Sequence, residues 1–187
     1  MLIGYAYTGS FCTISKSIQI MKRLIDNGMD VIPIMSDNAY NINTRFGEAK
    51  KIQEQIIQIC CKNIVHTIVD AEPLGPKIKL DALIISPCTG NTLAKLANGI
   101  TDTPVCMAAK AHLRNNSPLI ISLATNDALS ANLRNIATLM SKKNVYFTPM
   151  IQDDPIAKPH SLVADFDSIE ETLSLALQGK QITKIFI

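Results

Sequence analysis

Short apolar runs alternate along the chain with segments in which apolar residues recur every three or four positions. A run of four to eight apolar residues is typical of a buried strand, and the wider spacing is typical of an amphipathic helix. The clearest helical stripe is Ile14, Ile18, Met21 and Ile25. The apolar runs predict strands at residues 2–7, 30–35, 64–69, 81–87, 118–124 and 145–148.

Helical segments are expected between most of these strands and after the last one. The first helix ends at Asn27-Gly28, and the last begins at Ser168, where Glu171 completes a capping box. The other helices are expected around residues 49–60, 91–98, 105–113 and 129–140. Strands that alternate with helices predict an α/β fold, a single doubly wound parallel sheet in a Rossmann-like or flavodoxin-like three-layer sandwich.

We expect residues 1–187 to form one domain. The stretch 149–159 contains three prolines and two adjacent aspartates, and it is the single linker-like region of the chain. Too little sequence follows it to build a second core, so we interpret it as a long loop.

Composition narrows the function classes. Lys and Arg number 18 against 16 Asp and Glu, and without a basic run this balance predicts no nucleic-acid partner. No apolar run approaches the ~20 residues of a membrane helix, and the N-terminus lacks a signal peptide pattern. The five cysteines are odd in number and form no metal-binding spacing, so we expect reduced thiols, no metal and a cytoplasmic protein.

The charged share, 18%, is low for a soluble protein, and buried parallel strands account for part of the excess apolar content. The rest predicts contact surface, to which the apolar tail 182–187 would contribute. We therefore expect a homo-oligomer and a protein partner.

Small polar residues follow four of the predicted strands, at 8–10, 36–38, 86–92 and 124–126. Ligands of doubly wound sheets bind at the carboxyl ends of strands, and helix N-termini there can hold a phosphate. The dinucleotide pattern G-x-G-x-x-G and the P-loop are both absent, which favours a mononucleotide. The same residue types also serve as ordinary helix caps, and that interpretation stays open.

Residues 86–102, SPCTGNTLAKLANGITD, resemble the P-x-S-A-N-T…K-x-A-N-G-I-x-D block of the flavin-containing cysteine decarboxylase superfamily. The resemblance implies a flavin mononucleotide (FMN), with its phosphate at the first turn and with Asn91 and Thr92 at its ring or ribityl chain. The cofactor-binding candidates are Thr8, Gly9, Ser10, Ser36, Pro87, Cys88, Thr89, Asn91, Thr92, Thr125 and Asn126.

Within that superfamily, residues 8–13, 43–48, 71–77, 125–129 and 177–181 resemble the family of dipicolinate synthase B subunits. This resemblance implies a partner, the A subunit of dipicolinate synthase, which would carry NADP. Together the two proteins would oxidise dihydrodipicolinate, a small dicarboxylate, to dipicolinate in the mother cell of a sporulating bacterium.

The chain departs from the decarboxylases at two places. Gly75-Pro76 stands about where they carry a catalytic His, and residues 123–129 lose both methionines of their P-x-M-N-x-x-M pattern. Three hypotheses follow. The chain is part of a flavin-dependent oxidoreductase, or it is a non-catalytic binding protein that completes the A subunit, or it is an independent flavin-dependent decarboxylase, which the missing His disfavours.

No catalytic residue is evident, but a dianionic substrate calls for cations. Arg45 follows the second strand and Lys77 precedes the fourth, and both are candidates to bind the substrate carboxylates; the alternative is that both are solvated loop charges. Cys12 and Cys88 lie in the ligand loops without a neighbouring base, so we interpret them as packing residues. His160, in the Pro-rich loop, is an acid–base candidate if that loop covers the site.

Overall fold

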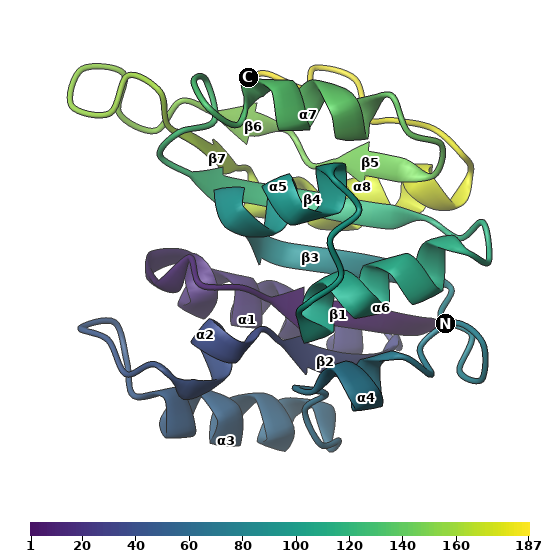
Figure 1. The fold of residues 1–187 in the computed structure, drawn as a ribbon. Coiled ribbons are helices and arrows are strands. Elements are labelled where there is room, and N and C mark those ends of the chain that lie inside the picture. The colour runs from purple at the N-terminus through teal and green to yellow at the C-terminus, as the bar shows by residue number, and fades with distance from the viewer.

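The computed structural model describes residues 1–187 and has the expected alternation of strands and helices (Figure 1). The elements are β1 (Leu2–Tyr7), α1 (Phe11–Asp26), β2 (Asp30–Met35), α2 (Asp37–Asn41), α3 (Ala49–Cys60), α4 (Ile68–Ala71), β3 (Ala82–Cys88), α5 (Gly90–Ala97), α6 (Pro104–Leu113), β4 (Leu119–Thr125), α7 (Leu133–Met140), β5 (Val145–Phe147), β6 (Met150–Ile151), β7 (Leu162–Ala164), the 3₁₀ turn η1 (Phe166–Ser168) and α8 (Ile169–Leu177). None of the helices is long and apolar enough to cross a membrane.

Five strands form a parallel sheet in the order β2-β1-β3-β4-β5, which is the flavodoxin-like order. This confirms the predicted fold class. The sheet is nevertheless mixed, because β7 pairs antiparallel with the end of β4 and β6 pairs antiparallel with β7. The stretch predicted as a plain loop after residue 148 therefore contributes one of these two short strands.

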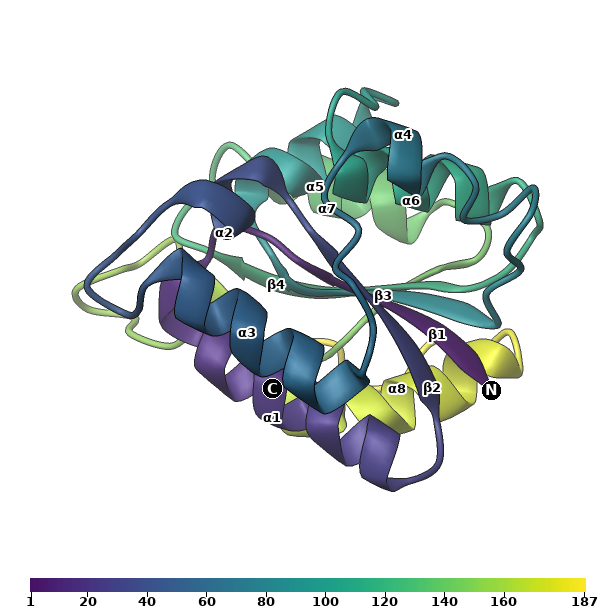
Figure 2. The same ribbon diagram turned by 90° about the horizontal axis from the view of Figure 1, so that it is seen from below.

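Helices cover both faces of the sheet (Figure 2). One face packs against α1, α3 and α8, and the other against α4, α5, α6 and α7. The strands between them are almost entirely apolar; all seven residues of β3 are buried. Burial on both faces explains why the sequence shows continuous apolar runs rather than alternation.

The predicted strand at residues 64–69 is wrong. Val65 makes a single parallel bridge beside Ile34, and the chain then turns into α4. Thr67 caps that helix by accepting a hydrogen bond from the Asp70 N–H. Val69 is 79% exposed, so the apolar run here is not a buried one.

The start of the last helix also differs from the prediction. Ser168 makes no capping box, because its hydroxyl donates to Asp165 at the preceding 3₁₀ turn. The apolar tail returns to the sheet, where Met150 N–H donates to the Ile185 carbonyl at 2.7 Å. The outermost residues, Phe186 and Ile187, remain 55% exposed.

A buried polar contact fastens α1 to the sheet. The hydroxyl of Ser17, on α1, donates to the Ser86 carbonyl of β3 at 2.6 Å, and the Tyr5 hydroxyl lies 2.9 Å from the Ser17 oxygen. Burial raises the pKa of Tyr5 to about 12, so its hydroxyl keeps its proton. The bonded side chains hold the start of α1 beside the end of β3.

The ends of β1 and β3 are joined by one side chain. The Thr8 hydroxyl donates to the Pro87 carbonyl at 2.8 Å and accepts from the Thr89 N–H at 2.9 Å. Thr8 is 1% exposed, so water does not compete for these bonds. The loop after β1 and the loop after β3 are thereby held next to each other.

We predict that Thr8→Val lowers the free energy of unfolding by about 1–3 kcal/mol, because the part-buried Thr89 N–H loses its acceptor. Thr8→Ser keeps the hydroxyl and should retain most of the stability. Thr138→Val, which removes an exposed hydroxyl from α7, is the control. Urea unfolding measures all three, and equal losses for Thr8→Val and Thr138→Val would contradict the prediction.

Candidate functional site

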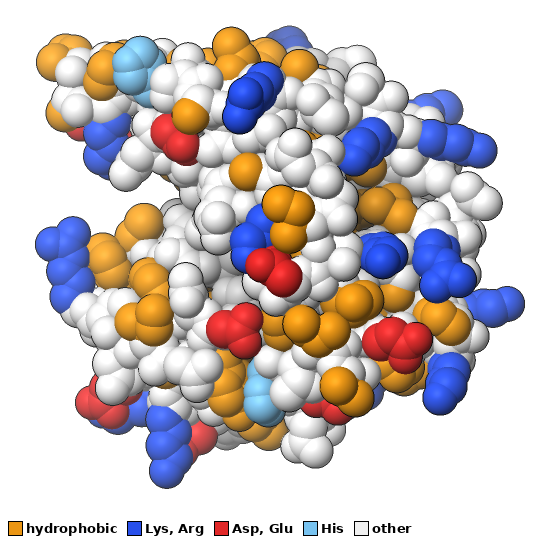
Figure 3. Space-filling model, in the orientation of Figure 1, with side chains coloured by type: hydrophobic (Ala, Val, Ile, Leu, Met, Phe, Trp, Pro, Cys, Tyr) orange, Lys and Arg blue, Asp and Glu red, His pale blue; other side chains and the backbone are white.

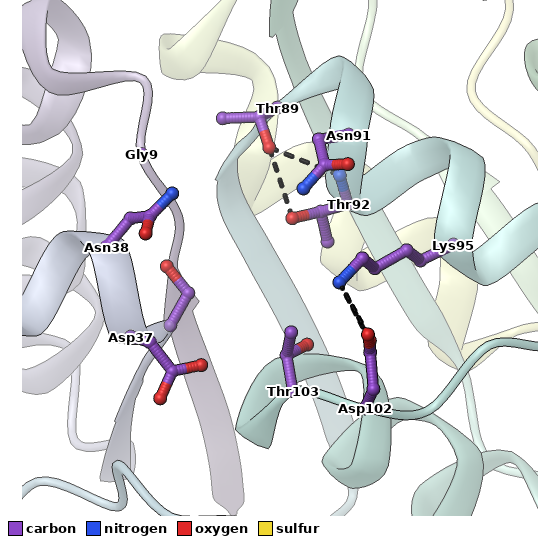
Figure 4. A pocket seen from close by; sticks show the side chains of 10 residues that line it. Gly9, Asp37, Asn38, Thr89, Asn91, Thr92, Lys95, Asp102 and Thr103 are labelled. Carbon is purple, nitrogen blue, oxygen red and sulfur yellow. Dashed lines mark hydrogen bonds and ion pairs between the residues drawn. The ribbon is translucent and has the colours of Figure 1, made fainter.

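A polar hollow of about 360 Å³ lies at the carboxyl edge of the sheet, and no apolar side chain lines it (Figure 4). Three loops meet there: one follows β1, one follows β2, and one leads from β3 into α5. The start of α6 closes the far side. The lining residues are Gly9, Ser36, Asp37, Asn38, Thr89, Asn91, Thr92, Lys95, Asp102 and Thr103.

Several hydroxyl groups of this polar hollow are engaged as helix caps. Ser36 accepts from the Ala39 N–H at 3.3 Å, Thr89 accepts from the Thr92 N–H at 3.2 Å, and Thr103 accepts from Cys106. The ordinary interpretation of these residues as caps is therefore correct for their acceptor oxygens.

Other polar groups of the hollow have no partner within the protein. The side-chain amides of Asn38 and Asn91 make no hydrogen bond, and neither does that of Asn126 in the adjoining loop. The Thr92 hydroxyl accepts from Thr89 at 3.1 Å and keeps its own proton free to donate. These are donors positioned by secondary structure and available to a ligand.

One ion pair lines the side of the polar hollow where α5 and the start of α6 meet. Lys95 of α5 contacts both carboxylate oxygens of Asp102, at 2.8 and 3.0 Å (Figure 4). The hydrogen bond from Lys95 lowers the pKa of Asp102 below its usual value, so this carboxylate stays ionised near neutral pH. Asp37 also lines the hollow and forms no ion pair, so the lining has two carboxylates and one ammonium group.

A second hollow, of about 310 Å³, opens on the other side of Gly9 and Thr89. We call it the loop hollow, because two loops, 42–48 and 152–161, contribute to its lining. These loops flank the notch at the left of the molecule in Figure 3. Its lining is partly apolar and includes Lys158, which pairs with Asp153 at 3.0 Å. The lining residues are Gly9, Ser10, Phe11, Cys12, Thr13, Phe46, Thr89, Ala124, Thr125, Asn126, Asp153, Lys158 and Val163.

Gly90 allows the start of α5 to approach the loop after β4. A Cβ atom at this position would lie 2.6 Å from the Thr125 hydroxyl and 2.5 Å from the Asn132 amide. That hydroxyl donates to Asp127 at 2.6 Å, and Asn132 donates to the same carboxylate. A glycine therefore permits the two loops to share one hydrogen-bonded cluster at the edge of the loop hollow.

The structure separates the cofactor-binding candidates into two groups. Gly9, Ser36, Thr89, Asn91 and Thr92 line the polar hollow, and Gly9, Ser10, Thr89, Thr125 and Asn126 line the loop hollow. Three candidates lie beneath the hollows instead: the buried residues Thr8, Pro87 and Cys88.

Those buried candidates hold the site without facing it. Thr8 and Pro87 bond to each other, as described above. Burial raises the pKa of the Cys88 thiol well above its usual value, which supports the interpretation of this cysteine as a packing residue.

The two predicted carboxylate-binding cations lie at opposite ends of the molecule. Arg45 is exposed beside the loop hollow, with its guanidinium 4.8 Å from the ring of Phe46, which lines that hollow. Lys77 lies in the loop that enters β3, where Asp81 N–H donates to the Leu2 carbonyl at the amino edge of the sheet. The expectation that Lys77 reaches the carboxyl edge is therefore wrong, since a loop that enters a parallel strand meets its amino end.

Other candidates for proton transfer are also away from the hollows. His160 is exposed and lines neither of them. His66 stacks on Tyr40 with ring centroids 4.0 Å apart. Gly75, at the position of the missing His, packs against α6 near Ala111.

Sequence reasoning missed the four charged residues that line the hollows in pairs, Lys95 with Asp102 and Lys158 with Asp153. Lys95 and Asp102 fall inside the resembling block and could have been found there. Lys158 and Phe46 belong to irregular loops, where no periodicity in the sequence indicates which way a side chain points.

Comparisons with known proteins agree on one family. The Flavoprotein family model matches residues 1–174. The chain is 44% identical to the dipicolinate synthase B subunit of Bacillus subtilis over 185 residues, which are 99% of this chain and 92% of that protein.

Solved structures give the same result. The crystal structure of the dipicolinate synthase B subunit from Bacillus halodurans superposes with a TM-score of 0.92 at 44% identity, over 100% of this chain and 95% of that one. An FMN-dependent cysteine decarboxylase shares the fold at 20% identity, with a TM-score of 0.70 over 94% of this chain and 97% of that one. The chain therefore belongs to the Flavoprotein family and, within it, to the family of dipicolinate synthase B subunits.

Proposed function

We propose that this chain acts with the A subunit of a dipicolinate synthase to oxidise dihydrodipicolinate to dipicolinate in the mother cell of a sporulating bacterium. FMN would lie in the polar hollow of this chain, and the partner would carry NADP. The observation that carries the proposal is the convergence of unpartnered amide and hydroxyl groups from several loops on two hollows that share Gly9 and Thr89. The 44% identity to a dipicolinate synthase B subunit supports the choice of reaction.

The residues of the polar hollow, together with Ser10 of the adjoining loop hollow, suit the polar part of a flavin mononucleotide. A phosphate needs N–H and O–H donors, and Gly9 with Ser10 at the start of the 16-residue helix α1 provides them. The free amides of Asn38 and Asn91 and the Thr92 proton can donate to ribityl or ring oxygens. An FMN in this position would supply a two-electron acceptor.

The loop hollow suits a planar dicarboxylate. Phe11 and Phe46 offer apolar ring faces, and Lys158 is the one cation among the lining residues. Arg45 stands over Phe46 at the rim, within the same loop. We propose that Lys158 and Arg45 contact the substrate carboxylates; Lys158, at the carboxyl edge, takes the role that the sequence suggested for Lys77.

Oxidation of dihydrodipicolinate removes a hydride and a proton from the ring. Among the residues that line the two hollows, the lysines and two of the aspartates are already tied in ion pairs. Their pairing suits them to bind and orient an anion rather than to exchange a proton near neutral pH. This observation favours the second candidate function, in which this chain is non-catalytic, completes the A subunit and leaves the hydride transfer to the partner's nicotinamide.

An independent flavin-dependent decarboxylase is the third hypothesis, and the site opposes it. None of the three His residues lines either hollow. Gly75-Pro76, at the position of the catalytic His of the decarboxylases, lies where the side chain of Asn115 donates to the Gly75 carbonyl, beyond the C-terminal end of α6.

We predict that Gly9→Val strongly weakens FMN binding while the fold persists. A Cβ atom at Gly9 meets its nearest neighbours at 3.6 and 3.7 Å, which is ordinary contact, but the two further methyl groups would enter the hollows. Gly9→Ala should weaken FMN binding only slightly, and Gly9→Val by more than roughly tenfold. Quenching of flavin fluorescence gives the Kd, and circular dichroism checks the fold.

The two leading functions predict different spectra for the assembled enzyme. We expect the complex of this chain with the A subunit to be yellow, with one flavin per copy of this chain, and to lose the colour with the Gly9→Val variant. A colourless complex that still forms dipicolinate with the nicotinamide alone would instead establish the non-catalytic role. Mass spectrometry of the denatured supernatant identifies the bound cofactor.

We predict that the double variant Lys158→Met/Asp153→Asn raises the KM for dihydrodipicolinate about tenfold, because a carboxylate loses its cation. Changing both partners avoids leaving Asp153 unpaired beside an anionic substrate. Arg45→Ala should raise KM by a smaller factor. Lys50→Met, on α3, is a matched control whose KM should equal that of the wild type; an unchanged KM in the double variant would remove Lys158 from the site.

A further inference from the structure

The part of the α4–α7 layer that is formed by α6 and α7 is rich in basic residues, whereas Asp70 on α4 and Asp102 before α6 are acidic residues of the same layer. From residue 104 to residue 144 the chain has five Lys or Arg residues and one acidic residue, Asp127. That aspartate is bonded to Thr125 and Asn132. The other fifteen acidic residues lie outside this segment, which forms α6, β4 and α7. Figure 3 views this layer, and basic side chains gather on its right half.

A third hollow, of about 400 Å³, opens within this layer, between the end of α5 and the end of α6. We call it the docking hollow. Its surface is mainly apolar, with Leu96, Ile100, Cys106 and Leu113 in the lining, and Ile100 is 46% exposed. Lys110, Arg114 and Lys142 also line it. An apolar centre with a charged rim is the usual anatomy of a protein contact.

The three cations are not neutralised within the chain. None of them forms an ion pair. Lys110 and Arg114 are exposed one helical turn apart at the end of α6, and Lys142 directs its ammonium to the carbonyls of Leu96 and Ala97, both at 3.3 Å. The rim therefore offers positive charge without an acidic partner.

We propose that the docking hollow binds an acidic segment of the A subunit that carries an apolar side chain, with that side chain between Leu96, Ile100 and Leu113 and its carboxylates on Lys110 and Arg114. This inference rests on the proposed two-protein function. Charge complementarity selects a polypeptide with acidic residues, and the apolar centre gives no contact to the phosphates of a nucleic acid.

A two-fold contact with a second copy of this chain is a poorer fit to this hollow. A two-fold contact through this hollow would bring each basic rim onto its own symmetry mate, and like charges in contact oppose association. A partner whose segment is acidic meets no such repulsion.

The position of the docking hollow gives its occupant a path to the site. Helix α5 contributes Asn91 and Thr92, in its first turn, to the polar hollow and Leu96, in its last turn, to the docking hollow. Leu96 follows Asn91 and Thr92 by five and four positions, so a partner that contacts the last turn of the helix lies a little more than one turn from the FMN candidates.

Isothermal titration calorimetry measures the binding of full-length variants of this chain to the purified A subunit. The test variants are Lys110→Glu/Arg114→Glu and, for the apolar centre, Ile100→Asp. The matched control is Lys50→Glu/Lys180→Glu, which makes the same change of net charge at exposed residues of the other helical layer. Sedimentation of each variant alone reports self-association.

We expect both test variants to weaken the Kd for the A subunit to at least about ten times the wild-type value, with self-association and the control unchanged. The wild-type affinity should also fall with added salt. Unchanged binding in the test variants would overturn the docking site while leaving the two-protein function intact. Loss of self-association in those variants would overturn it in favour of a second copy, and failure of the wild type to bind the partner would overturn both proposals.

Discussion

The site depends on the hydrogen bonds of one buried hydroxyl. Thr8 joins the end of β1 to the end of β3, and the residues that follow on either side, Gly9 and Thr89, are the two that both hollows share. The twist and pairing of the sheet bring the strand ends near each other, but they do not fix the loops beyond them. The Thr8 hydroxyl fixes these loops, because it donates to one of them and accepts from the same segment. Its burial keeps the bonds from exchanging with water.

Contacts beneath the hollows hold the same loops in place. Ser17 ties α1 to Ser86 two residues before Cys88, so the helix whose first turn faces the loop hollow is held by the strand that leads into α5. Gly90 then lets α5 begin against the loop after β4. These three close contacts, at Thr8, Ser17 and Gly90, belong to residues with small side chains, which is why the site consists mostly of Gly, Ser, Thr and Asn. Larger side chains would keep the loops apart and place the free amides beyond the reach of one ligand.

The sequence predicts the parallel sheet well, because each buried strand is a continuous apolar run and each main helix has an apolar stripe. It also predicts which loops gather at the carboxyl edge, since parallel strands end on the same side. It fails where structure depends on pairing between distant segments. Strands β6 and β7 have two and three residues and exist through contact with the end of β4. The position of Lys158 follows from that pairing, because it lies between β6 and β7. Lys77 lies in the loop that leads into β3, so it is at the amino edge of the sheet instead.

The two lysines of the hollows, each paired with an aspartate, suggest how an anion could be accepted without an isolated cation in the site. A lysine held by a carboxylate is already oriented, and an arriving phosphate or carboxylate needs only to share or replace one of its contacts. The unpaired cations of the docking hollow present the opposite case, because their charge is open to solvent and can attract a partner over a distance of about a Debye length. Cations that are paired inside the site and unpaired on the α5–α6 surface are the distribution expected of a protein that holds small anions and meets a larger acidic partner.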